Sequence, residues 1–433
     1  MSHITKVLVL GYVWPEPNSS AAGRHMLSLL KSFLAENWHL TFASPALQGE
    51  HKIDLNRLGI EEKNIALNCS SFDDFILELQ PDVVLFDRFM LEEQFGWRVA
   101  QHCPQALRIL DTEDLHSLRQ VRHLALKQQR ELNTADLNSD LAKREIAAIY
   151  RCDLSLVISE YEYQLLQQHY QVPSEILLHC PFMLDLNSQV HPNLEFEQRQ
   201  HFISIGNFRH EPNWDAVLWL KQTIWPLIRK QLPKAEMHIY GAYPPPKATQ
   251  LHNVQQGFLL KGWASDAEQV MTQARVCLAP LRFGAGLKGK LVEAMLCGTP
   301  SVTTSIGSEG MGLATSLVAI NDNSNNETLN WPGRMVEFSV DKQDAVAELI
   351  AQQAITLYTD KNLWQQSQQL GYQWLSHHFD QVPLRQRLLH RIKHIVASLE
   401  THRANNFIGQ MLQHHQFKST QYMAQWIEAK NRK

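Results

Sequence analysis

The sequence predicts an α/β protein with two domains, each built on a doubly wound parallel sheet. Apolar runs of strand length alternate with longer segments in which apolar residues recur at helical spacing, and this alternation is typical of a parallel sheet covered by helices. The alternation begins at Lys6 and begins again at His201. Between the two halves the chain loses periodicity and gathers Pro, Asn and Ser, which predicts a linker over residues 186–198.

The first half begins with a near-continuous apolar run at residues 6–12, which indicates a strand buried on both faces. A proline-containing loop follows, and residues 21–34 then show helical spacing. The remaining strands predicted for this half are residues 39–44, 82–86, 106–110 and 154–159, the last of which closes the sheet. The remaining predicted helices are residues 72–79, 122–130 and 160–169.

The second half repeats this order. Its predicted strands are residues 201–205, 236–240, 276–280 and 302–304, and its predicted helices include 216–227 and 267–275. After residue 378 the chain turns into polar amphipathic helices at 383–399 and 407–430. We therefore divide it into residues 1–185, the linker, residues 199–378, and a helical tail at 379–433. The spacing of Leu388, Ile392, Ile395 and Leu399 predicts one buried stripe on that tail.

Composition excludes several classes of protein. A formal net charge of -4 argues against a nucleic-acid partner, which would require a basic face. No run of 18 apolar residues is present, and the first residues lack the features of a signal peptide, so we expect a cytoplasmic protein. The six cysteines include no C-x-x-C pair, and no histidine cluster has ligand spacing. Small core residues, and no bound metal, are therefore expected.

The most informative stretch is residues 281–311, LRFGAGLKGKLVEAMLCGTPSVTTSIGSEGM. A glycine-rich turn precedes Lys288 and Lys290, and an apolar helix pattern follows that carries one carboxylate, Glu293. A helix start offers free N–H groups and the positive end of its dipole, so this loop suits a phosphate or a diphosphate. The alternative is that the glycines only allow close packing of helix on strand.

The whole run resembles the nucleotide-binding segment of the GT-B glycosyltransferases of group 1, the family 4-like class that uses nucleotide-diphospho-sugars. The resemblance implies two Rossmann-like domains facing a cleft, with the last helices crossing back onto the first domain. It also implies that Glu293 holds the ribose hydroxyls, while Gly286, Leu287 and Lys288 face the phosphates.

Other donor-side residues follow from the same resemblance. The strand at 201–205 ends in Gly206 and Asn207, where many family members have Gly-Arg, and Pro212 replaces a lysine five residues further on. Arg209 and Lys288 are expected to supply the missing positive charge. The segment 259–263, with Gly262, resembles the family loop that lines the base pocket.

The acceptor side is expected in the first domain. Gly23 and Arg24 match the family loop that meets acceptor or donor, although Ser19 or Ser20 capping a helix explains the same residues. The family also places a functional histidine near the transferred sugar. His116 is the best match, with Asp114 or Asp111 as its orienting partner, and the alternative is that Asp114 only caps a helix.

The resemblance implies a metal-independent, retaining glycosyltransferase of hexosyltransferase type. Its partners would be a nucleotide-sugar donor and a glycan or lipid-linked acceptor, as in polysaccharide biosynthesis, and it needs no cofactor. Retaining relatives carry a further glutamate eight positions before the ribose-binding one, where this chain has Ala285. That departure keeps two alternatives open: a degenerate nucleotide-sugar or carbohydrate-binding module and a nucleotide-sugar epimerase. The apolar residues of the tail leave a peripheral membrane contact open, beside simple packing.

Overall fold

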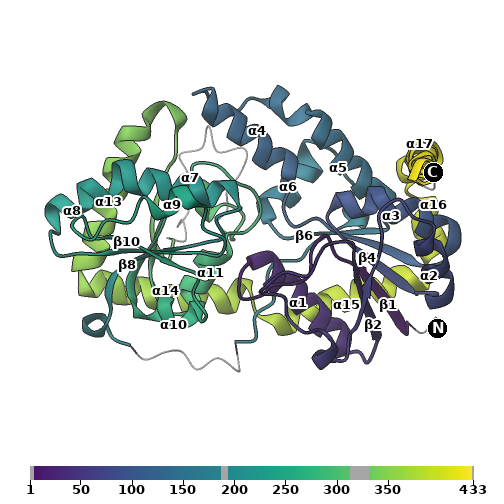
Figure 1. The fold of residues 1–433 in the computed structure, drawn as a ribbon, viewed down its shortest axis with the longest axis horizontal. Helices are drawn as coiled ribbons and strands as arrows, with labels where there is room; N and C mark the ends of the chain where they lie inside the picture. The colour runs from purple at the N-terminus through teal and green to yellow at the C-terminus, as the bar shows by residue number, and fades with distance from the viewer. Residues whose placement is uncertain (1–3, 187–193, 313–330, 432–433) are drawn as a thin grey trace, which may run out of the picture.

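The computed structural model describes residues 4–186, 194–312 and 331–431, which form two lobes joined side by side (Figure 1). The first lobe contains a seven-stranded parallel sheet of order β3-β2-β1-β4-β5-β6-β7. Its strands are β1 (Lys6–Leu10), β2 (His39–Ser44), β3 (Glu61–Asn64), β4 (Val83–Asp87), β5 (Leu107–Asp111), β6 (Leu154–Val157) and β7 (Leu177–His179).

Helices cover both faces of this sheet, because its central strands bury both of theirs. Alternate residues of β1 enter different cores: Val7 and Val9 pack on one face, and Leu8 and Leu10 on the other. The helices of the lobe are α1 (Ala21–Leu34), α2 (Ser71–Leu79), α3 (Phe89–His102), α4 (His116–Lys127), α5 (Asp140–Arg151) and α6 (Glu160–Gln168).

The second lobe has a six-stranded parallel sheet of order β10-β9-β8-β11-β12-β13. The strands are β8 (Gln200–Ile205), β9 (Met237–Tyr240), β10 (Phe258–Gly262), β11 (Ala274–Ala279), β12 (Ser301–Thr304) and β13 (Gly333–Val336). The α-helices are α7 (Glu211–Trp219), α8 (Trp225–Gln231), α9 (Pro246–Thr249), α10 (Ala267–Gln273), α11 (Gly289–Leu296), α12 (Ser305–Ser308), α13 (Gln343–Thr359) and α14 (Lys361–His378).

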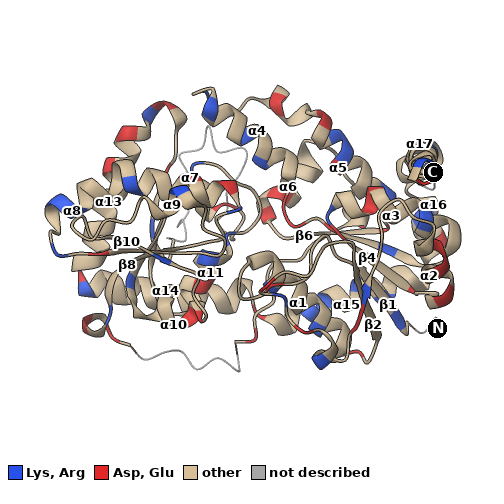
Figure 2. Ribbon diagram, viewed as in Figure 1, with Lys and Arg blue, Asp and Glu red and all other residues tan. Residues whose placement is uncertain are grey.

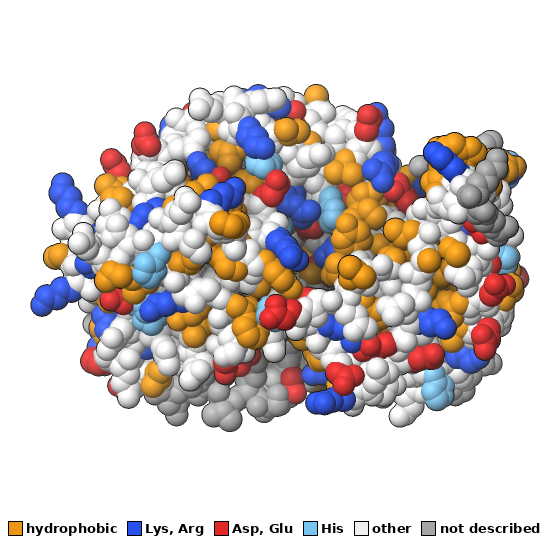
Figure 3. Space-filling view, viewed as in Figure 1, with side chains coloured by type: hydrophobic (Ala, Val, Ile, Leu, Met, Phe, Trp, Pro, Cys, Tyr) orange, Lys and Arg blue, Asp and Glu red, His pale blue; other side chains and the backbone are white. Residues whose placement is uncertain are grey.

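Three final helices return to the first lobe: α15 (Gln381–Ala397), α16 (Leu399–Ala404) and α17 (Phe407–Asn431). The predicted stripe is confirmed, since Leu388, Ile392, Ile395 and Leu399 are buried in the same core as Val7. Helix α17 packs against α3 and α5, while its outer face exposes Phe407, Tyr422 and Trp426 (Figure 3, upper right). No described helix has the length and apolarity needed to cross a lipid bilayer.

Several predicted boundaries were wrong. The run at 154–159 does not close the first sheet, because β7 pairs beyond β6. The missed strands lie at sheet edges: β3 is polar and largely exposed, β7 has three residues and β13 has four, so none shows a clear hydrophobic period. Residues 258–262 form an edge strand, β10, where a loop was expected. Helix α4 starts at His116, six residues before its predicted start. Of the predicted linker, residues 187–193 lie outside the described residues.

Candidate functional site

The carboxyl ends of both sheets face the junction between the lobes, which is where open α/β sheets bind ligands. A cavity of about 410 Å³ opens at this junction. Its lining comes from the first lobe through Arg24, His51 and Lys52, and from the second through Glu268 and Leu296. Lysine and arginine positions mark the ribbon near the centre of the view, where the lobes meet (Figure 2), and basic side chains are visible there in the space-filling view (Figure 3).

The glycine-rich turn lies directly against the first lobe. Gly286 has φ of +63°, a conformation that glycine adopts without strain, and a Cβ added there would lie 2.8 Å from the Cβ of Asp114. The Gly286 N–H donates to Oε1 of Glu162 at 2.7 Å. A buried carboxylate of α6 therefore occupies one of the N–H groups for which the sequence predicted a phosphate.

Two lysines follow this turn, Lys288 buried and Lys290 half-buried. The Lys288 ammonium donates to the Gly286 carbonyl at 2.7 Å, and the Lys290 ammonium donates to Asn213 Oδ1 at 2.7 Å. Burial lowers the pKa of each lysine to about 8. A Cβ added to Gly206 would lie 3.0 Å from Lys290 Nζ, so Lys290 stands beside the end of β8.

Positive charge extends across the junction to His210, the residue before α7. Burial lowers the pKa of His210, and the charges of Arg119, Lys290, Arg88 and Lys288 add to that shift, which brings the pKa to about 3. Burial disfavours any charge in this place, but the positive charges that add to the shift of His210 would favour a bound anion.

The predicted ribose ligand meets the predicted acceptor-side loop. Arg24 Nη2 lies 3.2 Å from Glu293 Oε1, although one residue belongs to α1 and the other to α11. Burial raises the pKa of Glu293, while the charge of Arg24 opposes that shift. The two helix starts touch closely, because a Cβ added to Gly289 would lie 2.4 Å from the Cβ of Ala21.

Gly23 has a local role. The Ser20 hydroxyl accepts the Gly23 N–H at 3.0 Å and so caps α1, as the alternative interpretation of this loop expected. A Cβ added to Gly23 would lie 2.6 Å from the backbone of Glu16, so the glycine allows the loop to fold over the helix start.

The remaining donor-side residues are more exposed. Asn207 Oδ1 accepts the backbone N–H of Arg209 at 2.9 Å, and the Arg209 guanidinium lies 3.7 Å from the centre of the Tyr243 ring. Arg209 is thus turned toward the loop after β9, and Lys290 is the cation found beside Gly206. Gly262, with φ of +77°, ends β10 next to Trp263, which stacks on His51 at 4.3 Å.

The predicted histidine and one of its two candidate partners lie together. His116 Nε2 is 3.4 Å from Asp114 Oδ1, and Asp114 also pairs with Arg119. Burial lowers the pKa of His116 to about 4. Asp114 does not cap α4, because the N–H groups of His116 and Ser117 donate to Glu145 at 2.7 and 2.8 Å. Asp111, the other candidate partner, faces His25.

The sequence analysis missed the residues that join the lobes. Arg122 forms a paired contact with Glu309, both bonds 2.7 Å, and donates to the Gly284 carbonyl at 2.8 Å. Glu162 also accepts the Leu115 N–H at 3.1 Å. These side chains lie on helices with ordinary amphipathic patterns, so no local signal marks them. Arg88 directly follows β4, and this place at the end of a strand is the feature of the sequence that could have marked it as a site residue.

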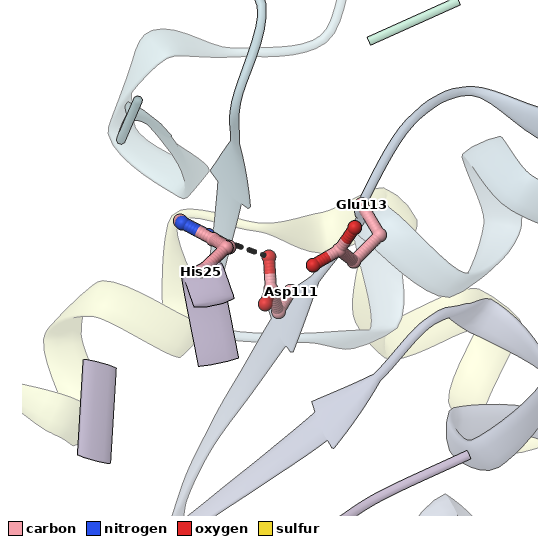
Figure 4. Close-up of side chains that lie close together, drawn as sticks. All are labelled: His25, Asp111 and Glu113. Carbon is pink, nitrogen blue, oxygen red and sulfur yellow. Dashed lines mark ion pairs between the residues drawn. The ribbon is translucent and has the colours of Figure 1, made fainter. Parts of the chain in front are cut away.

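Three side chains of metal-ligating type gather at the end of β5: His25, Asp111 and Glu113 (Figure 4). They are the one group of this kind among the described residues. The spacing search missed them because His25 lies on α1, far from the other two in sequence.

Comparisons with known proteins agree with this architecture. Residues 199–329 match the family model of the group 1 glycosyl transferases. No curated protein matches the sequence significantly. Among solved structures, sucrose-phosphate synthase from Thermosynechococcus elongatus has a TM-score of 0.63 at 14% identity, over 91% of this chain and 100% of that one.

Two further structures have the same fold. Anabaena Alr3699/HepE in complex with UDP and glucose has a TM-score of 0.61 at 14% identity, over 90% of this chain and 100% of that one. WaaG, described as a glycosyltransferase involved in lipopolysaccharide biosynthesis, has a TM-score of 0.56 at 12% identity, over 88% and 98% of the two chains.

Proposed function

We propose that the protein transfers a sugar from a nucleotide-diphospho-sugar to a hydroxyl acceptor, because residues 199–329 match the model of the group 1 glycosyl transferases and the chain has a GT-B fold. The predictions of this fold and of this family are confirmed. The observation that carries the proposal is the arrangement of Lys288, Lys290 and Glu293 around the start of α11, opposite the strand ends of the first lobe.

The proposed donor site uses the second lobe. Glu293 binds the ribose hydroxyls, and the backbone from Gly286 to Lys288, with the start of α11, receives the diphosphate. Lys288 and Lys290 stabilise the negative charge that develops on the leaving diphosphate, so this site requires no metal ion. Gly206 and Asn207 border the same space, with Lys290 beside them.

The first lobe supplies the acceptor side. Arg24 reaches the cleft from α1, and His116 with Asp114 stands at the start of α4, next to the glycine-rich turn. We propose that these groups orient the acceptor hydroxyl and the transferred hexose, with retention at the anomeric carbon. The UDP and glucose held by HepE and the role described for WaaG support a glycan or lipid-linked acceptor in polysaccharide biosynthesis. The exposed apolar face of α17 is the surface that a peripheral membrane contact would use.

A second candidate, a binding module without turnover, is favoured by one observation. Ala285 occupies the position where retaining relatives carry the further glutamate, so this chain has no carboxylate there. The Ala285 side chain packs into the core of the first lobe. The missing group would have contacted the sugar, while the ribose and diphosphate contacts do not depend on it. An epimerase would need an acid/base pair beside the sugar, and product analysis without acceptor tests it.

The proposal is tested with a thermal-shift panel of UDP, GDP, ADP, CMP and their sugars against wild type and Glu293→Ala. A ligand that binds only the folded state raises its stability. We expect a shift for one base, lost in the variant, followed by turnover of that donor with glycan acceptors. Binding without turnover would favour the binding module, and no shift at millimolar nucleotide would contradict both.

A further inference from the structure

We propose that His25, Asp111 and Glu113 form a binding site for a first-row divalent cation, Mn²⁺ or Zn²⁺, in the first lobe. The inference does not depend on the proposed glycosyl transfer. The site lies where α1, the end of β5 and the following loop meet, and the three side chains point toward one another (Figure 4). One ligand atom from each lies within 4.8 Å of the others, so small side-chain movements bring all three onto one ion.

The polar atoms of His25 and Asp111 are buried and lack hydrogen bonds. His25 and Asp111 are 1% and 0% exposed, yet neither ring nitrogen of His25 and neither carboxylate oxygen of Asp111 has a hydrogen-bond partner. His25 Nε2 and Asp111 Oδ1 stand 3.6 Å apart, beyond hydrogen-bonding distance. Buried polar groups are normally hydrogen-bonded, because leaving one unsatisfied costs about 1–3 kcal/mol. A shared ligand at the centre of the cluster would satisfy these groups together.

The charge of the cluster also calls for a cation. Asp87, Asp111 and Glu113 are three carboxylates close enough to influence one another, and Arg88 is the guanidinium among them. Arg88 Nε lies 3.9 Å from Asp87, whose other oxygen accepts the Tyr12 N–H at 2.9 Å. With all carboxylates ionised, one guanidinium leaves two negative charges unbalanced in a buried place. A divalent cation with a neutral His25 brings the cluster to neutrality.

Protons are the competing source of positive charge. Burial acts to lower the pKa of His25, but Asp111 and its neighbours raise it overall, and burial raises the pKa of Glu113 to about 7. A bound metal would compete with protons for these ligand atoms.

Two residues at this cluster have an unfavourable backbone conformation. Glu113 and Arg88 both have positive φ, +59° and +72°, although neither is glycine, and each follows the end of a central strand. Such conformations are rare for non-glycine residues and concentrate at functional sites. Phe182 lies edge-on to the His25 ring at 5.8 Å and so restricts its orientation. Glu113 is only partly buried, which leaves an ion a path into the cluster.

The ligand set selects the metal. Mg²⁺ and Ca²⁺ prefer all-oxygen sites, whereas one imidazole with two carboxylates suits Zn²⁺ or Mn²⁺. Three protein ligands leave at least one position for water. A cation here would stand close to the glycine-rich turn, because the Glu113 carbonyl lies 3.4 Å from where a Cβ on Gly286 would be.

The test is titration of the chelator-treated full-length protein with Zn²⁺ by calorimetry and with Mn²⁺ by electron paramagnetic resonance. We expect one equivalent to bind and to raise the melting temperature. His25→Gln, Asp111→Asn and Glu113→Gln should each weaken binding by at least about tenfold, since even outer-shell partners account for 10–100-fold. His238→Gln is the matched control, because His238 stacks on His201 and contacts Glu236 away from this cluster.

The outcomes are distinct. Asp111→Asn is nearly isosteric, so it carries the test if His25→Gln does not fold. Loss of binding in Asp111→Asn and Glu113→Gln, with binding kept in His238→Gln, supports the site. No binding at 1 mM of either ion would overturn the proposal and would leave protons as the source of the neutralising charge. Binding lost only in His238→Gln would overturn it as well.

Discussion

Arg24 and Glu293 form an ion pair of 3.2 Å that joins the start of α1 to α11 across the junction of the lobes. Its members were assigned from the sequence to different substrates, the acceptor and the donor ribose. Burial raises the pKa of the carboxylate proposed to bind the donor, and their contact means that a residue of the opposite lobe opposes this shift. Donor affinity should therefore depend on both lobes.

Replacing Glu293 should weaken donor binding without unfolding the protein. Glu293→Gln removes the negative charge of the carboxylate that is proposed to accept hydrogen bonds from two ribose hydroxyls. The Kd for the nucleotide should therefore rise about tenfold or more, which corresponds to about 1.4 kcal/mol. Calorimetry measures this. Glu268→Gln, which alters another carboxylate lining the cavity, is the control and should leave the Kd within about twofold. Equal losses in both variants would contradict the assigned role.

Replacing Glu162 should have the opposite effect. Its buried carboxylate accepts the Gly286 N–H, where the diphosphate is proposed to bind, and a bound phosphate would be repelled by it. Glu162→Gln removes that charge, and we expect the Kd for the nucleotide diphosphate to fall about tenfold. Glu145→Gln is the control, because Glu145 is likewise buried and raised in pKa, to about 7, but contacts the start of α4. Weaker binding in Glu162→Gln would place the phosphates elsewhere.

Donor affinity should fall as pH rises through 8. Lys288 and Lys290 have pKa values lowered by burial to about 8, so the ammonium charge that attracts the diphosphate is lost above that pH. Affinity measured between pH 7 and 9.5 should decline, and Lys290→Met should flatten the profile. The stability of the ligand-free protein should change in the opposite direction. In the unfolded chain both lysines stay protonated up to about pH 10.5, so the free energy of unfolding should rise with pH between about 8 and 10.5. A donor affinity that does not change with pH would show that the two ammonium groups do not bind the diphosphate.

The sequence could predict what is local or periodic. The predicted helix at residues 21–34 coincides with α1, and β2 coincides with its predicted run, because both show a clear apolar period over a buried face. The segment from Gly284 to Glu293 was recognisable because a glycine turn, two lysines and a carboxylate lie close together in the sequence. Polar edge strands such as β3 show no such period and were missed.

Contacts between distant residues could not be predicted in the same way. The bonds from Glu162 to Gly286 and from Arg122 to Glu309 join residues more than a hundred positions apart, and each partner alone reads as an ordinary helix or loop residue. The cluster of His25 with Asp111 depends likewise on the order of strands in the sheet, which brings α1 over the end of β5.

His116 should affect turnover and leave donor binding unchanged. It contacts Asp114 and the Phe89 ring in the first lobe, and none of the donor-binding groups. His116→Gln should lower kcat at least tenfold with the donor Kd unchanged, which would assign it to the reacting sugar and acceptor. Since burial lowers the pKa of His116 to about 4, the ring is neutral from pH 5 to 9. The pH profile of kcat should therefore show no step near pH 6.5 that depends on His116. Asp114→Asn, which keeps the shape but not the charge, should share the kcat loss only if Asp114 orients the ring. A His116→Gln enzyme with full kcat would make this pair a structural contact of α4.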